Sequence, residues 1–176
     1  MDIKRTEIIA SAASETEAKE IYTAAVKALT EASLTVATAE SCTGGLMGKL
    51  FTDVSGASAV FSGGMITYTN NIKINKLGVS AETIEKHTEV SFECAAEMAV
   101  RAREYFETDL SLSATGYTGP TGGTEKDPVG TVYIGIATSN FVEVKRLSFG
   151  SIDREKIRYG TAKIAAESLI CAMKTI

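Results

Sequence analysis

A serine and a cysteine stand side by side in the segment Thr38-Ala39-Glu40-Ser41-Cys42-Thr43-Gly44-Gly45. An apolar strand is expected to end at this segment, and a helix to begin within it. In open α/β folds, ligands bind at such carboxyl ends of strands. Backbone N–H groups at the start of a helix can face an anion, and adjacent glycines let a ligand come close to the main chain. The segment therefore offers a nucleophile, donors for an anion and room for a substrate.

Ser41 is the first candidate nucleophile. Its hydroxyl needs a base within hydrogen-bond reach, and helix-start N–H groups of Cys42, Thr43 or Gly44 could stabilise an oxyanion. The same serine could instead only cap the helix, because serine is a common N-cap residue. Cys42 is the rival nucleophile, since a thiol at a helix N-terminus has a lowered pKa. A buried packing role is the alternative for this cysteine.

Tyr68 and Lys73, in the segment Tyr68-Thr69-Asn70-Asn71-Ile72-Lys73, are the candidates for moving protons. A lysine acts as a base only when neutral, so its pKa must fall from ~10.4 to ~7, at a cost of roughly 4 to 5 kcal/mol to the charged form. Burial beside the strand end would supply this change. Tyr68 could relay the proton or donate to the oxyanion. The alternative is a strand-end tyrosine and a solvated lysine.

A third candidate is the glycine-rich segment 116–124, which would expose backbone donors that can hold a phosphate. It lacks the Gly-Lys-Ser/Thr ending of a Walker loop and the spacing of a dinucleotide fingerprint. An ordinary surface turn is the alternative. Arg154, at the start of the last predicted helix, could hold an anion, or it could simply be solvent-exposed.

Composition excludes several classes of function. The chain of 176 residues has a net charge of −4 and no basic block, so we expect no nucleic-acid partner. No apolar run approaches the ~18 residues that span a bilayer, and the polar residues 1–16 do not resemble a secretory signal. We therefore expect a cytoplasmic protein without a membrane partner.

The counts of cysteine and histidine narrow the chemistry further. Three widely spaced cysteines, an odd number, favour a reduced, cytoplasmic setting. A single histidine, His87, excludes a multi-histidine metal site. A Ser-His-acid triad could use only His87, and a position near a helix C-terminus is the favoured interpretation of this residue.

Hydrophobic periodicity and turn residues predict alternating strands and helices. Helices are predicted at residues 15–32, from the octapeptide to residue 50, at 70–77 with Asn70-Asn71 as the cap, and after the capping residues Ser80, Ser91 and Asp153. Strands are predicted at 34–39, 60–68, 110–114, 131–137 and 141–149. Gly63-Gly64 indicates a bulge or a close backbone approach.

This alternation predicts an α/β protein, a three-layer α/β/α sandwich. Ser139-Asn140 suggests a hairpin, which requires an antiparallel pair, so the sheet should be mixed and mostly parallel. We expect a single domain over residues 1–176, with residues 1–15 as a polar N-terminal extension. The oligomeric state stays open, a homo-oligomer included.

The chain resembles the CinA C-terminal domain family, the stand-alone nicotinamide mononucleotide amidohydrolases. The Glu-Ser-Cys-Thr-Gly-Gly sequence of residues 40–45 is the most specific match, and the order of the other matches strengthens it. The matching segments are residues 39–45, 56–58, 68–73, 77–79, 90–91, 116, 119–123, 128–132 and 149–154. The chain departs from the family pattern at Tyr117-Thr118, where Ile-Ala is usual.

The resemblance implies deamidation of nicotinamide mononucleotide to nicotinic acid mononucleotide and ammonia, within pyridine nucleotide salvage. It implies Ser41 as nucleophile, Lys73 as base and Tyr68 as assistant, with no metal and no organic cofactor. The substrate-binding residues expected on this basis are Cys42, Thr43, Gly44, Gly45, Ser58, Gly116, Gly119, Gly122, Gly123 and Arg154. A non-catalytic nucleotide-binding or adaptor domain and a Cys42-dependent hydrolase of another amide are the alternatives.

Overall fold

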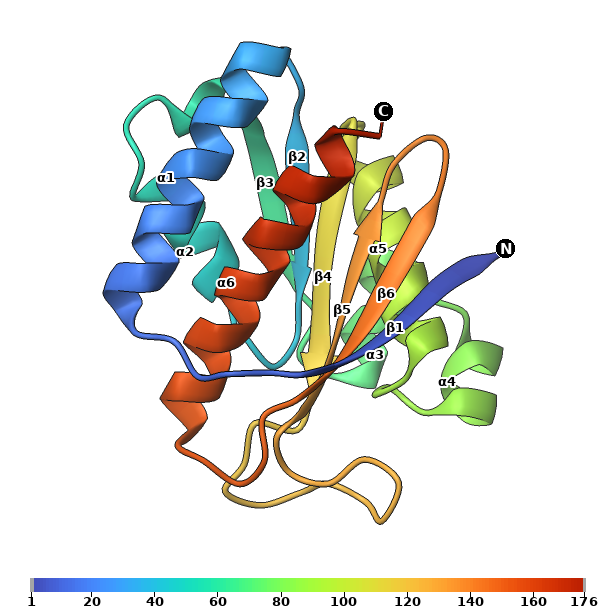
Figure 1. The fold of residues 1–176 in the computed structure, drawn as a ribbon. Coiled ribbons are helices and arrows are strands. Elements are labelled where there is room, and N and C mark those ends of the chain that lie inside the picture. The colour runs from blue at the N-terminus through green and yellow to red at the C-terminus, as the bar shows by residue number, and fades with distance from the viewer. Residues whose placement is uncertain (1, 176) are drawn as a thin grey trace.

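Strands and helices alternate along the chain in a computed structural model that describes residues 2–175 (Figure 1). The strands are β1 Ile3–Ile9, β2 Val36–Glu40, β3 Phe61–Ile66, β4 Leu110–Gly116, β5 Thr131–Ala137 and β6 Val142–Ser148. The α-helices are α1 Glu15–Ala32, α2 Leu46–Thr52, α3 Asn70–Ile72, α4 Ala81–His87, α5 Phe92–Phe106 and α6 Arg154–Met173. A 3₁₀ turn at Ala57–Ala59 precedes β3, and a π-helical turn at Lys73–Leu77 continues α3.

The strands form one six-stranded sheet in the order β1-β6-β5-β4-β2-β3. β5 runs antiparallel to both of its neighbours, and the other three pairs are parallel. The predicted hairpin at Ser139-Asn140 joins β5 to β6, where Ala137 pairs with Val142. The prediction of a mixed, mostly parallel sheet is therefore confirmed.

Helices cover both faces of the sheet, which confirms the predicted three layers. Figure 1 shows α1, α2 and α6 on one side and α3, α4 and α5 on the other. On the first side, Tyr22 of α1 packs edge-on against Phe51 of α2, with the ring centroids 4.7 Å apart. The large apolar side chains of α1, α2 and α6 pack against this face of the sheet and form the largest cluster of the hydrophobic core.

The opposite layer packs closely because α5 presents alanines to the sheet. Ser111 and Ser113 of β4 donate to the carbonyls of Ala99 and Ala95, each over 2.6 Å. A Cβ added to Gly135 of β5 would lie 2.5 Å from the carbonyl oxygen of Ala95. The backbone of α5 therefore lies against the sheet at a distance that larger side chains would prevent.

The N-terminal segment corrects one expectation. Residues 1–15 were expected to form a polar extension, but β1 pairs in parallel with β6 at the edge of the sheet. Its central residues carry charges, and Arg5 forms an ion pair with Glu93 of α5 over 2.8 Å. Because an edge strand with an exposed face keeps polar side chains, the hydrophobic pattern of this segment is weak.

Other local predictions hold in part. Thr69, rather than Asn70, caps α3, because the Thr69 hydroxyl accepts from the N–H of Ile72. The close approach predicted at Gly63-Gly64 is present: a Cβ on Gly64 would lie 2.2 Å from Thr38 Oγ1. Ser80, Ser91 and Asp153 cap α4, α5 and α6 as predicted.

Candidate active site

A cavity of about 260 Å³ opens at the carboxyl ends of β2 and β4. Its wall consists of residues 41–42, 68, 73, 89–90, 115–119, 121 and 154. The parallel pairing of β2 with β4 brings Ser41 beside the end of β4, where the Ser41 N–H donates to the carbonyl of Ala114 over 2.9 Å. Five segments that are distant in sequence therefore meet where an open α/β sheet usually binds its ligand.

Lys73 and Ser41 are in contact at the floor of this cavity. Lys73 Nζ lies 3.0 Å from Ser41 Oγ and donates to the carbonyl of Thr67 over 2.8 Å. The lysine side chain is only 1% exposed, and it takes part in none of the ion pairs found in residues 2–175. Burial lowers the pKa of the Lys73 amine, because water no longer solvates its charged form.

The start of the α3 segment positions the lysine. Thr69 caps the segment, and the N–H of Lys73 donates back to the Thr69 carbonyl over 3.0 Å. The π-helical turn that follows is held by Leu77, which is buried among side chains of α5 such as Met98. This anchoring directs the Lys73 side chain inward to the end of β2.

Tyr68 lies at the mouth of the cavity, and 63% of its surface is exposed. Within residues 2–175 its hydroxyl makes no hydrogen bond to Ser41 or Lys73. The lysine amine reaches the serine hydroxyl without the tyrosine between them.

The N-terminus of α2 corrects the expectation that its free N–H groups face a ligand. The buried carboxylate of Glu40 accepts from the N–H groups of Gly45 and Met47 at 3.0 Å each, and from that of Gly48 at 2.8 Å. A carboxylate of the chain itself therefore occupies the position that an external anion would take.

Ser41 is not a helix cap, because the N-cap of α2 is Gly45, four residues later, and the helix begins at Leu46. The candidate oxyanion donors lie instead in the turn between β2 and α2. Within the described chain, the N–H groups of Cys42 and Thr43 donate to no backbone carbonyl. Cys42 also lines the cavity, which makes its N–H the first candidate for an oxyanion donor.

The Cys42 thiol is not activated. Burial, followed by the nearby charge of Glu40, raises the pKa of Cys42 to about 12. The lowered pKa expected for a thiol at a helix N-terminus is therefore wrong, because Cys42 lies before the helix and the helix N-terminus is already occupied by a carboxylate.

The glycine-rich loop supplies the opposite wall. Gly116 and Gly119 line the cavity together with Thr118, whose buried hydroxyl has no hydrogen-bond partner in residues 2–175. The Arg154 guanidinium also lines the cavity and donates to the carbonyl of Gly119 over 2.7 Å. The loop and the start of α6 are thus joined at a point where a ligand would lie.

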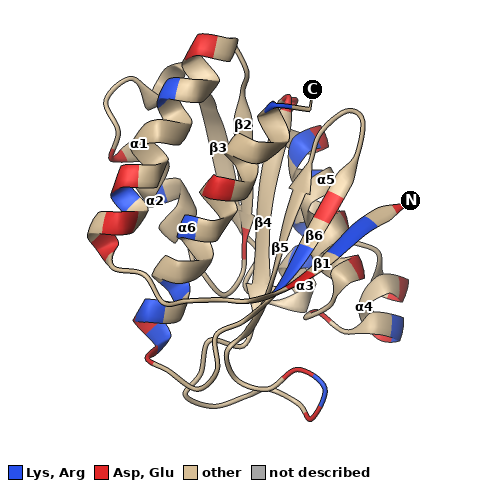
Figure 2. Ribbon diagram, viewed as in Figure 1, with Lys and Arg blue, Asp and Glu red and all other residues tan. Residues whose placement is uncertain are grey.

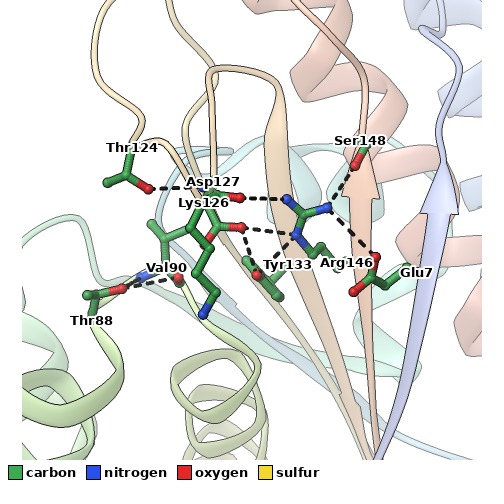
Figure 3. A network of polar contacts seen from close by, with 9 residues as sticks. All are labelled: Glu7, Thr88, Val90, Thr124, Lys126, Asp127, Tyr133, Arg146 and Ser148. Atoms are coloured by element: carbon green, nitrogen blue, oxygen red, sulfur yellow. Dashed lines mark hydrogen bonds and ion pairs between the residues drawn. The ribbon is translucent and has the colours of Figure 1, made fainter.

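A polar cluster holds the far end of this loop on the sheet (Figure 3). The Arg146 side chain donates to Asp127 over 3.0 Å and to the Lys126 carbonyl over 3.1 Å. Tyr133 of β5 donates to the same Asp127 carboxylate over 2.9 Å. Although burial opposes its charge, the hydrogen bonds to Asp127 and Tyr133 raise the pKa of Arg146. The loop therefore rests on an ion pair between Arg146 and Asp127.

Some predicted substrate-binding residues lie away from the cavity. Ser58 borders a separate hollow with Gly56 and Phe61. Because β3 runs parallel to β2, the residues just before β3 lie at the end of the strands opposite to the cavity. The 56–58 segment precedes β3, as the predicted strand at 60–68 already required, so it lies at the amino-terminal ends of β2 and β3 and away from the cavity.

Other predicted residues have structural roles next to the cavity. The carbonyl of Thr43 accepts from the guanidinium of Arg158. Gly44 and Gly45 form the turn into α2, and Gly122 and Gly123 form the turn of the glycine-rich loop. Within the described chain, none of these five residues lines the cavity.

Glu89, which was not among the residues predicted from the sequence, lies between α4 and α5 and lines the cavity. Its carbonyl accepts from the Thr115 hydroxyl over 2.7 Å, which ties the segment to the end of β4. No local pattern marks this glutamate, since only the fold brings it to the site. His87 ends α4 and lies 3.7 Å from Glu93, so it is not part of this site and a Ser-His-acid triad is excluded.

Positive and negative side chains are interspersed over the elements in Figure 2. Within residues 2–175, no helix is long and apolar enough to cross a membrane, and no group of three or more side chains that could hold a metal ion is present.

Comparison with known proteins shows the family. The model of the CinA C-terminal domain matches residues 18–173. A relative in Thermoanaerobacter sp. (strain X514), named as a competence-damage inducible protein, is 49% identical over 150 residues, which are 85% of this chain and 35% of the relative. A CinA-like protein of Fervidobacterium nodosum is 42% identical over 151 residues, 86% of this chain and 37% of that protein. The chain thus spans about a third of the length of these curated relatives.

Solved structures show the same fold. A competence/damage inducible protein of Agrobacterium tumefaciens has a TM-score of 0.85 at 36% identity, over 88% of this chain and 94% of that one. A CinA superfamily protein of Klebsiella pneumoniae 700603 has a TM-score of 0.86 at 29% identity, over 90% of this chain and 99% of that one.

Proposed function

Because the chain belongs to the CinA C-terminal domain family, we propose that it is an amidohydrolase of nicotinamide mononucleotide. The products are nicotinic acid mononucleotide and ammonia. The names of the relatives state no such activity, so the proposal depends on the chemistry that the cavity can perform.

The contact between Lys73 and Ser41 carries the proposal. A buried amine without a carboxylate partner loses its proton more readily than a solvated one. Once neutral, Lys73 still donates to the carbonyl of Thr67, and its lone pair faces the Ser41 hydroxyl 3.0 Å away. This arrangement is what a serine nucleophile needs in place of a histidine.

In the first step Ser41 Oγ attacks the carboxamide carbon while Lys73 Nζ takes the hydroxyl proton. The N–H of Cys42 stabilises the oxyanion, and the Tyr68 hydroxyl at the cavity mouth can assist it. The C–N bond then breaks, and the leaving NH₂ group takes the proton from Lys73 and departs as ammonia. Water, deprotonated by the same amine, hydrolyses the ester, which restores Ser41 and releases the carboxylic acid.

The other wall of the cavity fits the rest of the nucleotide. Arg154 supplies a positive charge for the phosphate, and the loop that contains Gly116 and Gly119 can approach the ribose closely. The unpartnered hydroxyl of Thr118 is a further group that a bound ligand would satisfy.

The test is the release of ammonia from nicotinamide mononucleotide by the purified protein. We expect Ser41→Ala to abolish release, and Ser58→Ala, the same substitution outside the cavity, to leave it unchanged. Full turnover by Ser41→Ala would contradict the nucleophile. Binding of the nucleotide without ammonia release by the unmodified protein would favour a non-catalytic nucleotide-binding domain.

A further inference from the structure

Glu89 is the one carboxylate among the described residues that line the cavity. Its backbone is fixed, because its carbonyl accepts from Thr115 and the next residue, Val90, is buried. Its side chain is half-buried and takes part in none of the hydrogen bonds or ion pairs found in residues 2–175. A carboxylate that is partly removed from water without a partner is unfavourable unless a ligand supplies a positive charge.

The charge of Glu89 acts on the reactive part of the cavity. Burial lowers the pKa of Lys73, and among the opposing influences is the negative charge of Glu89. On Tyr117, burial followed by the charge of Glu89 raises the pKa. The carboxylate is therefore electrostatically close to both walls between which the reacting group would lie, although it pairs with neither.

The lining of the cavity includes side chains of both charges. Glu89 provides its negative charge, while Arg154 provides a positive one where the glycine-rich loop meets α6. The rings of Tyr68 and Tyr117 line the space as well, and aromatic rings attract a flat cation. A ligand that carries a cationic ring at one end and an anionic group at the other matches this distribution of charge.

We propose that Glu89 is a specificity-determining residue that selects carboxamides whose ring carries a positive charge. The inference rests on the proposed function and assigns the pyridinium ring to Glu89 and the phosphate to Arg154. A nucleotide with the same ribose and phosphate but a neutral ring loses the interaction with Glu89 and keeps all others.

The experiment compares nicotinamide mononucleotide with its 1,4-dihydro form, which differs in ring charge. For the unmodified protein we expect a higher kcat/KM with the cationic ring. Glu89→Gln should lower the ratio of the two kcat/KM values by about tenfold, mainly through the cationic substrate, because one partly buried charge pair is lost. Glu85→Gln, the same substitution at an exposed position of α4, should leave the ratio unchanged.

Two results would overturn the inference. One is an unchanged ratio in Glu89→Gln with only a shift of the acid limb of the pH–rate profile, which would mean that Glu89 acts on Lys73 and not on the ring. The other is a ratio that changes equally in Glu85→Gln, which would indicate a general effect of surface charge.

Failure of the proposed function would look different. If the unmodified protein releases no ammonia from either nucleotide, calorimetric affinities for the two still test Glu89. A preference for the cationic ring that disappears in Glu89→Gln supports the inference without catalysis. Equal affinities for the two nucleotides in the unmodified protein would overturn it.

Discussion

Lys73 and Arg146 are both largely withdrawn from water, but only Arg146 has a carboxylate beside it. The Arg146 guanidinium binds Asp127 over 3.0 Å, and these hydrogen bonds raise its pKa despite burial. Within residues 2–175, the hydrogen-bond partners of the Lys73 amine are a carbonyl and the Ser41 hydroxyl, and burial lowers its pKa. Burial opposes the charge of both side chains, but the ion pair keeps Arg146 charged, whereas Lys73 loses its proton more readily.

The difference separates a structural role from a chemical one. A paired cation fixes the glycine-rich loop on the sheet and has no proton to exchange near neutral pH. An unpaired amine is held in place by neutral groups, so its protonation can change without breaking an ion pair. Substitutions at the two positions should therefore affect different measurable properties.

The largest effect is expected for catalysis at Lys73. Lys73→Met removes the base and should lower kcat/KM for ammonia release by at least about 10³-fold. The matched control is Lys76→Met in the same turn, where the lysine is exposed and outside the cavity. Substantial activity in Lys73→Met would break the comparison.

The next effect is on stability at the paired site. Arg146→Met leaves the Asp127 carboxylate buried without its partner and should lower the free energy of unfolding by about 3 kcal/mol, measured in urea. Arg101→Met, which breaks the exposed pair with Glu104, should cost less than about 1 kcal/mol. A cost at Arg146 no larger than that at Arg101 would show that the cluster does not anchor the loop.

The dependence on pH sharpens the contrast. Activity should rise with pH along an acid limb whose midpoint lies below 10.5, since the neutral amine is the active form and burial lowers the pKa of Lys73. The unfolded chain binds the proton more tightly than the folded one in this range. The unmodified protein should therefore gain stability relative to Lys73→Met as the pH rises from the lowered pKa of the folded state towards 10.5. A stability difference that is constant over this range would contradict an unpaired, desolvated amine.

The smallest effect is expected at Cys42. Because burial and the Glu40 charge raise the pKa of this thiol to about 12, it is protonated at neutral pH and should react slowly with alkylating reagents. Cys42→Ala should keep most of the ammonia release. Rapid inactivation by a thiol reagent, in a variant whose exposed Cys171 has been replaced by serine, would favour the cysteine hydrolase instead.

The sequence predicted the elements with strong internal patterns. Periodicity and turn residues predicted the helix at 15–32 and the hairpin between β5 and β6. They also predicted strands at 34–39 and 110–114, which end at Glu40 and Gly116 in the structure. Strand β1 was not predicted, because its charged residues lie on an exposed edge strand and hide the hydrophobic pattern. For the site, adjacency along the chain identified Ser41, and the resemblance supplied Lys73 as its partner.

What could not be predicted depends on contacts between distant segments. The Glu40 carboxylate accepts hydrogen bonds from N–H groups at the start of α2, which the sequence pattern had suggested were free to bind a ligand. Glu89 lines the cavity only because the fold brings its segment to the end of β4. Likewise, Asp127 and Arg146 form a pair only in the folded sheet. Ser58 matched the family pattern, but it precedes β3 and therefore lies at the amino-terminal ends of the parallel strands, whereas the cavity lies at their carboxyl ends.

The pairing of β1 with β6 has a consequence for biosynthesis. Of the six strands, β1 leaves the ribosome first and β6 last, so the register of Ile3 with Val142 cannot form until nearly the whole sheet has been translated. Closing so long a stretch of chain slows folding, and until it closes both strands offer unpaired edges to neighbouring molecules. Shielding of this nascent N-terminal strand should therefore matter more for the yield of folded protein than for its final stability.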